Sequence, residues 1–134
     1  MLFRSTVSLD AIADKTYGDG TFSATTSASS GLTVTLQAGP ATVCDVPSGH
    51  TVRILANGTC TVTAAQSGNT NYLAATAAPS SSLSRTFVVA RKNLTVSGVS
   101  ANNRTYDGTR GATALVAPSF TAASLVGVVS GDTV

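Results

Sequence analysis

The feature that most constrains the fold of this chain is a pair of alternating segments separated by the dipeptide Asn57-Gly58. The segments HTVRILA (50–56) and TCTVTAA (59–65) turn an apolar side chain to one face at every second position. A period of two is that of a β-strand with one buried face. Asn and Gly both tolerate the positive φ angles of a tight turn. The pattern therefore predicts two half-buried strands separated by a tight turn at residues 57–58.

Three other segments carry the strand pattern. LTVTLQA (32–38) alternates strictly and is ended by Pro40, ATVCDV (41–46) precedes a turn at Pro47-Ser48-Gly49, and SRTFVVAR (84–91) follows later. Strands at this spacing, divided by Gly, Pro and Asn, favour an antiparallel β-sandwich. AIADK (11–15) and YLAATAA (72–78) are the only helix candidates, and both are short and poorly capped. We expect an all-β chain.

Composition supports this fold class and excludes several functions. The 134 residues include 21 Thr and 17 Ser but no Glu and no Trp, with 43% hydrophobic and 10% charged residues. Such a chain is too apolar for the disordered class, and Thr suits a half-exposed strand surface. The net charge of +2 comes from scattered basic residues, and aromatic residues make up only 5%, so we expect no nucleic-acid partner. No apolar run reaches the roughly 20 residues that span a bilayer.

The chain's two cysteines, Cys44 and Cys60, lie on strands to either side of the 50–56 strand. A disulfide between them is reasonable if these strands face each other or lie close together, and it would stabilise the fold by about 3 kcal/mol. Two buried free thiols are the alternative, because unpaired Cys packs as a small apolar residue. We favour the disulfide.

Catalytic, cofactor and metal sites are not expected. A nucleophile needs a base, and His50 is the single histidine, placed in a predicted turn without a motif that holds a hydroxyl beside it. Most aspartates lie in turn contexts such as Gly18-Asp19-Gly20, which turn capping explains. Calcium is the more serious alternative, since Asp10, Asp14 and Asp19 cluster before the first alternating strand, yet their spacing matches no calcium loop.

One phrase occurs twice. The first copy is ADKTYGDGTF (13–22), with Lys15, Thr16, Tyr17, Gly18 and Asp19. The second copy is NNRTYDGTRG (102–111), which has a basic residue and Thr followed by Tyr106, Asp107 and Gly108. Tyr17 and Tyr106 lie 89 positions apart, a spacing that fits one immunoglobulin-like unit of about 100 residues. We interpret the phrase as the start of a module, with each Tyr as a half-buried plug and the Gly-Asp or Asp-Gly pair as the turn that follows.

These residues resemble a known family. ATVCDVPSGHTVRILANGTCTVTAAQSGNTNYLAAT looks like the second half of a bacterial immunoglobulin-like repeat, and the phrase from Lys15 to Phe22 is similar to the MBG-type repeats of bacterial surface proteins. The C-terminal part, with TYDGT and LVGVVSGDTV, resembles the opening of a YDG-type repeat found in filamentous-haemagglutinin-like adhesins. The resemblance implies an MBG-type sandwich at 5–91 and a partial, truncated YDG-type β repeat at 92–134.

The resemblance also implies a function. We expect a non-catalytic spacer repeat of a large bacterial adhesin, extracellular on the cell surface or secreted, with neighbouring repeats of the same polypeptide as partners. MLFRSTVSLDA is no signal peptide because Asp10 interrupts its apolar part, so the export signal is expected elsewhere. The alternative is a module that itself binds glycan or host protein through end loops, with Asn69, Asn71 and Tyr72 as the candidate ligand loop. Since a half-sandwich cannot cover its inner face, we expect residues 92–134 to be loosely ordered or to leave a strand edge open.

Overall fold

The computed structural model describes residues 1–75, 83–98, 108 and 124–134. Strands make up nearly half of these residues and no α-helix occurs among them, which confirms the all-β prediction. The chain divides into two compact units, Met1–Lys92 and Asn93–Val134, and each is described by itself. The helix candidate at 11–15 contributes only Lys15 to a strand, and residues 76–78 of the other lie outside the described part.

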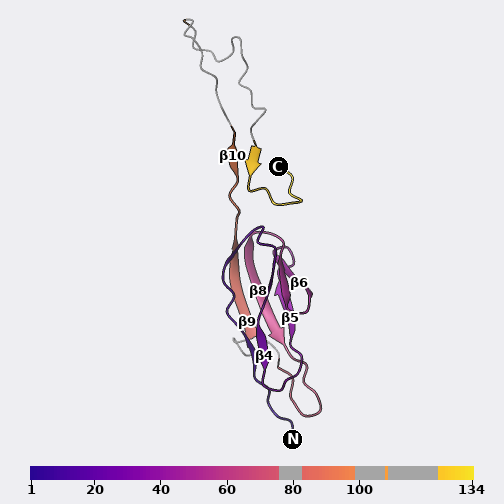
Figure 1. Ribbon diagram of the computed structural model, residues 1–134. Coiled ribbons are helices and arrows are strands. Elements are labelled where there is room, and N and C mark those ends of the chain that lie inside the picture. Colours follow the sequence, from indigo (N-terminus) through magenta and orange to yellow (C-terminus); the bar gives the residue numbers. More distant parts are fainter. Residues whose placement is uncertain (76–82, 99–107, 109–123) are drawn as a thin grey trace. The chain divides into compact units, whose positions relative to one another are not determined.

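The larger sheet of the first unit has the strand order β2-β9-β8-β5. β8 (Gly58–Ala65) lies between β9 (Ser84–Ala90) and β5 (Thr35–Gly39) and pairs antiparallel with both (Figure 1). β2 (Lys15–Thr16) pairs with the other edge of β9, and this pair is parallel. The expectation of purely antiparallel pairing was therefore wrong at β2. This short N-terminal strand pairs with the edge of β9, the last strand of the first unit, and runs in the same direction.

The smaller sheet has the order β3-β7-β6. β7 (Thr51–Ile54) pairs antiparallel with both β3 (Thr21–Ser23) and β6 (Cys44–Ser48). The register between β6 and β7 shifts between Asp45 and Ser48. An edge strand with such an irregularity can accept Pro47, which donates no ladder hydrogen bond. The turn expected at Pro47-Ser48-Gly49 therefore begins later, at Gly49.

Residues 41–43 differ from the prediction as well. They form a turn, in which the backbone amides of Val43 and Cys44 both donate to the carbonyl of Pro40. The strand expected at 41–46 thus begins only at Cys44. Pro40 is the physical reason, because it ends β5 and its carbonyl then closes the turn.

A third pair of strands completes the first unit. β1 (Val7–Leu9) and β4 (Thr26–Ala28) form an antiparallel ribbon, in which Val7 lies opposite Ala28 and Ser8 opposite Ser27. Val7 and Leu9 are buried in the core, whereas Ser8 Oγ lies 2.7 Å from Ser27 Oγ on the other face. The ribbon therefore contributes one apolar face to the core.

The core lies between the two sheets and beneath the β1–β4 ribbon. Its centre is formed by residues at most 2% exposed from both sheets and the ribbon: Leu9, Cys44, Val52, Cys60, Val62, Ala64, Phe87 and Val89. The predicted alternation is confirmed in β8, where Cys60, Val62 and Ala64 point inward. Between them, Thr59, Thr61 and Thr63 lie on the outer face, and Thr61 Oγ1 is 3.1 Å from Thr86 Oγ1 of β9. Threonine thus occupies the outer face of β8 and meets a threonine of β9 there.

The second unit contains β10 (Thr95–Ser97) and β11 (Ser124–Val126), which pair antiparallel. All six residues of this ribbon are exposed, including Val96 at 61% and Leu125 at 46%. Among the described residues of this unit, no strand covers the apolar side chains of the ribbon.

Candidate functional site

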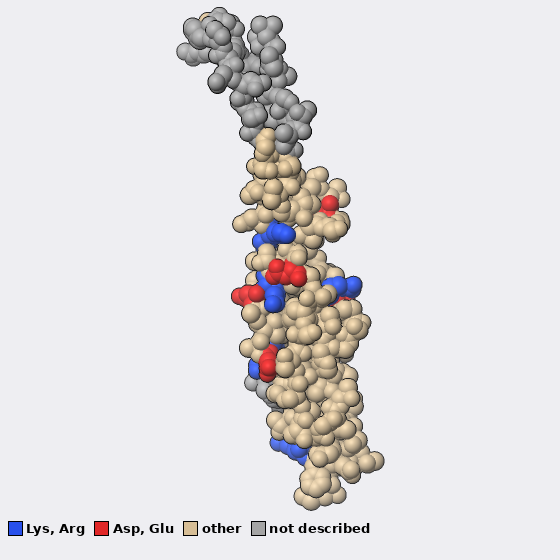
Figure 2. All heavy atoms as spheres, in the orientation of Figure 1, with Lys and Arg blue, Asp and Glu red and all other residues tan. Residues whose placement is uncertain are grey.

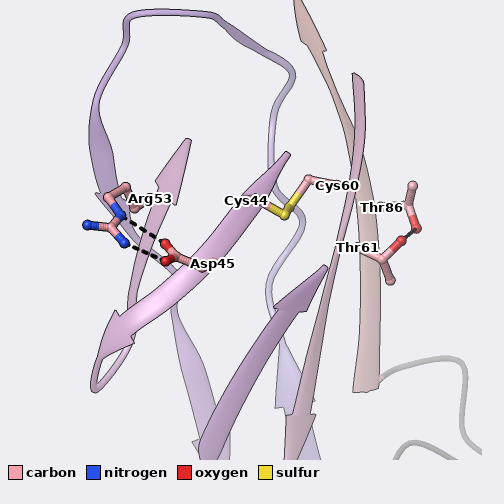
Figure 3. The surroundings of a disulfide bond; sticks show 6 residues. All are labelled: Cys44, Asp45, Arg53, Cys60, Thr61 and Thr86. Carbon is pink, nitrogen blue, oxygen red and sulfur yellow. Dashed lines mark hydrogen bonds and ion pairs between the residues drawn. A yellow bond between two sulfur atoms is a disulfide. The ribbon is translucent and has the colours of Figure 1, made fainter. Parts of the chain in front are cut away.

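The predicted disulfide is present. Cys44 of β6 and Cys60 of β8 are bonded, with their Cα atoms 6.0 Å apart, and both are fully buried (Figure 3). Because β6 belongs to the smaller sheet and β8 to the larger one, the bond joins the two sheets through the core. Its position confirms that the strands carrying the two cysteines face each other.

A charged pair lies beside the disulfide on the surface of the smaller sheet. Asp45 and Arg53 are opposite one another in β6 and β7, and Arg53 Nε donates to Asp45 Oδ1 at 3.0 Å while Nη2 donates to Oδ2 (Figure 3). The hydrogen bonds from Arg53, aided by its positive charge, outweigh desolvation and lower the pKa of the Asp45 carboxyl. The same contact raises the pKa of Arg53. The fork-like geometry fixes both charges, so the pair stabilises the fold and offers no reactive group.

The first copy of the repeated phrase forms a turn at the end of β2. Asp19 Oδ2 accepts from the backbone amide of Thr16 at 2.8 Å, the Asp19 amide donates to the Thr16 carbonyl, and Gly18 has a φ of 97°. Tyr17 is half-buried against the core, and its amide donates to the carbonyl of Ala90 at the end of β9. These contacts link the start of the first unit to its last strand.

In the second copy, Tyr106 and Asp107 lie outside the described residues. Gly108 is described and has a φ of 81°, a left-handed conformation that favours glycine. The roles proposed for Tyr106 and Asp107 stay predictions.

The candidate ligand loop is held by hydrogen bonds between the Asn69 side chain and the backbone of the loop. Asn69 Oδ1 accepts from the amides of Asn71 and Tyr72 at 2.8 and 2.9 Å, and the Asn69 amide donates to the Tyr72 carbonyl. The Tyr72 ring lies 6.1 Å from the ring of Phe3, whose amide donates to the Asn71 carbonyl. The loop therefore closes over the N-terminal segment, and the Asn69 carboxamide oxygen is used within the loop.

The residues considered for catalysis or metal binding are not brought together. His50 Nε2 lies 3.1 Å from Thr26 Oγ1, and the Asp14 carboxylate accepts from the Val88 amide of β9 at 2.7 Å. Asp19 serves the turn described above, and Asp10 is one of the residues that line a separate pocket. In the described ranges, no three His, Cys, Asp or Glu side chains are placed to hold a metal ion.

Sequence reasoning did not find this pocket. It has a volume of about 180 Å³ and is lined by the segment 10–13, by Lys15 and by residues 22–25, which include the end of β3. Lys15 Nζ lies 4.8 Å from the centroid of the Phe22 ring, which is thereby covered on one face. The pocket offers a carboxylate and hydroxyl groups but no nucleophile paired with a base.

Charge is sparse on the face of the molecule seen in Figure 2, where acidic and basic side chains occur in small, mixed groups on an uncharged background. This agrees with the absence of a basic cluster in the sequence. Among the residues that the structure describes, no helix has the length and apolarity needed to cross a membrane.

The ribbon β1–β4 of the first unit is repeated by the ribbon β10–β11 of the second. Thr6-Val7-Ser8 recurs as Thr95-Val96-Ser97, at the same offset of 89 that separates Tyr17 from Tyr106. The paired strand repeats too: Ser97 lies opposite Ser124 with their Oγ atoms 3.1 Å apart, as Ser8 lies opposite Ser27. In the sequence alone, the repeated tripeptide Thr-Val-Ser is the feature that indicates this structural repeat.

Comparison with known proteins adds no assignment, since no protein-family model, curated protein or solved structure matches the chain.

Proposed function

We propose that this chain is a non-catalytic spacer segment of a large bacterial surface or secreted adhesin, built from immunoglobulin-like β-sandwich modules in tandem. The single observation that carries the proposal is the repeated ribbon. β1–β4 and β10–β11 share the sequence Thr-Val-Ser, the antiparallel pairing and the serine pair on one face. A chain that forms the same two-stranded ribbon at the start of two successive units is organised as an array of modules.

The immunoglobulin-like assignment is supported by the strand order of the first unit. β1 pairs antiparallel with β4 in a separate ribbon, whereas β2 pairs in parallel with β9 at the edge of the larger sheet. An N-terminal segment whose two short strands pair with different parts of the fold, a covalent bond between the two sheets and about 90 residues per unit suit that class of sandwich. MBG-type and YDG-type remain the names that the sequence resemblance suggests for the two modules.

The surface of the first unit also suits a spacer. The outer face of the larger sheet carries hydroxyl groups, and its Thr61–Thr86 pair is bonded internally. Neighbouring modules with few charges neither attract nor repel each other over long distances. The buried disulfide favours an extracytoplasmic location, where such bonds persist.

The alternative, a module that binds glycan or host protein through its end loops, is less well supported. Asn69 and Tyr72 are the polar and aromatic residues that such a loop would present. Asn69 is engaged with the loop backbone and Tyr72 with Phe3, as expected of a closing loop.

A display series tests the spacer function. One, two and four copies of the 134-residue chain are placed between a surface anchor and a tip epitope, and the height of the epitope is measured. We expect equal increments per copy. A matched Gly/Ser linker of the same length is the control, since the end-to-end distance of a flexible linker grows only about as the square root of its length. Growth that follows the linker would contradict the proposal.

A binding screen separates the alternative. The intact chain is applied to glycan and host-protein arrays beside a Tyr72→Ala variant. Specific binding that this substitution removes, with the thermal stability unchanged, would favour the binding module over the spacer.

A further inference from the structure

The equivalence of the two ribbons identifies an uncovered core face in the second unit. Within each ribbon, opposite residues point to the same side, so Val96 and Leu125 share one face, as Val7 and Ala28 do. The serine pairs lie on the other face in both ribbons. Val96 therefore occupies the position of Val7, and Leu125 that of Ala28.

The surroundings of these equivalent residues differ sharply. Val7 is 4% exposed, whereas Val96 is 61% exposed. Ala28 packs against the core of the first unit, whereas Leu125 is 46% exposed. Among the residues that the structure describes, the ribbon residues are thus buried or half-buried in the first unit and exposed in the second.

The first unit shows what covers such a face. Val7 and Leu9 belong to one core cluster with Val62 and Ala64 of β8 and Phe87 of β9. β8 and β9 carry apolar residues at alternate positions, and both follow β4 in the sequence. β8, which comes after the ribbon in the sequence, contacts β1 directly and is thus part of its cover.

We propose that the Val96–Leu125 face is the core face of a second module, and that its partner is a run of strands of the same module type following β11 in the same polypeptide. The inference rests on the proposed tandem function. The ribbon residues carry no charge, so the partner strands would be uncharged on the facing side, as β8 is. Two strands of three residues offer far less area than the roughly 1,200 Å² that a specific interface between two copies buries.

A chimaera tests the proposal. Because Ser29 is equivalent to Val126, residues 30–92 are joined directly after Val126, so that the strands of the first unit follow the second ribbon. Hydrogen exchange is measured at 95–97 and 124–126 in the parent chain and in the chimaera. We expect fast exchange in the parent and protection greater by more than roughly tenfold in the chimaera.

Two substitutions in the chimaera show which face is responsible. Val96→Asp should remove the gained protection. Ser97→Asp, on the opposite face of the same strand, should retain it. In the parent chain, Val96→Asp should leave the unfolding of the first unit unchanged.

Three results would overturn the proposal. The first is a chimaera that gains no protection at the ribbon. The second is a monomeric parent chain that already protects Val96 and Leu125 as strongly as Val7, which would mean that the chain covers this face itself. The third is a parent dimer, detected by light scattering, that Val96→Asp dissociates. None of these results depends on ligand binding by the first unit or on epitope height, so they are distinguishable from failure of the spacer function.

Discussion

Phe22 of β3 and Phe87 of β9 meet edge to face between the two sheets, with ring centroids 5.5 Å apart and planes inclined by 80°. Phe87 is 2% exposed and Phe22 is half-buried, with Lys15 over its outer face. The contact joins the strand that begins the smaller sheet to the strand that ends the first unit. It therefore depends on residues far apart in the sequence.

Phe87→Ala should destabilise the first unit by about 3–5 kcal/mol, because it removes a buried ring and leaves a cavity. Urea unfolding followed by circular dichroism measures the loss. The matched control is Val88→Ala on the same strand, where the side chain is 49% exposed and the change should stay within about 0.5 kcal/mol. Equal effects of the two substitutions would mean that Phe87 is not a core residue.

Loss of the disulfide should cost about 3 kcal/mol, because the bond closes a loop with a sequence separation of 16 and so restricts the unfolded chain. The variant is Cys44→Ala combined with Cys60→Ala, which leaves no buried polar group. Its free energy of unfolding is compared with that of the oxidised parent. Reduction of the parent should give a similar loss, and an unchanged midpoint after both treatments would contradict a bridge between the sheets.

The Asp45–Arg53 pair should make stability depend on pH in acid. Since the pKa of Asp45 is lowered in the folded state, the contribution is fully present above the ordinary aspartate pKa of about 3.9 and is lost as pH falls through the lower folded value. The difference in Tm between the parent and Asp45→Asn should therefore be small but present at pH 7 and vanish in strong acid. High salt should reduce it, because Arg53 is 48% and Asp45 31% exposed.

Arg53→Gln is the control for this pair. In the Arg53→Gln background, the further change Asp45→Asn should leave Tm unchanged at every pH, because Asp45 then has no partner in Arg53 to lose. A difference that persists in strong acid would show that Asp45 acts through packing and not through its charge.

Gly68→Ala should be more damaging than Gly49→Ala. Both glycines have positive φ, 73° and 52°, so both substitutions incur a left-handed strain of roughly 1–2 kcal/mol. A Cβ at residue 68 would also lie 2.5 Å from the carbonyl oxygen of Tyr72, whereas none meets an atom within 4 Å at residue 49. Thermal unfolding compares the two, and exchange at Asn71 and Tyr72 should accelerate only in Gly68→Ala. Identical behaviour would mean that the 67–72 loop is not tightly closed.

Local patterns in the sequence determined the strands with a clear period of two. β7 and β8 lie where the alternation places them, and Val52, Ile54, Cys60 and Val62 point inward as predicted. This succeeds because the direction of a side chain in a strand depends only on its position along that strand. The short strands β1 to β4 were missed, since two or three residues are too few to show a period.

The sequence by itself thus determined the all-β class and the inward residues of the long strands, and it favoured the disulfide over two free thiols, a choice that the structure decides. Only the tertiary structure decided which sheet each strand joins. The chain bends at Ala56-Asn57 between β7 of one sheet and β8 of the other, one residue before the turn predicted at 57–58, because Gly58 already belongs to β8. β2 pairs with β9 across more than sixty intervening residues. The physical reason is that sheet membership is set by long-range burial and backbone pairing, which no local period encodes. The uncovered Val96 follows the same rule, because its sequence matches that of buried Val7 and only the strands around it differ.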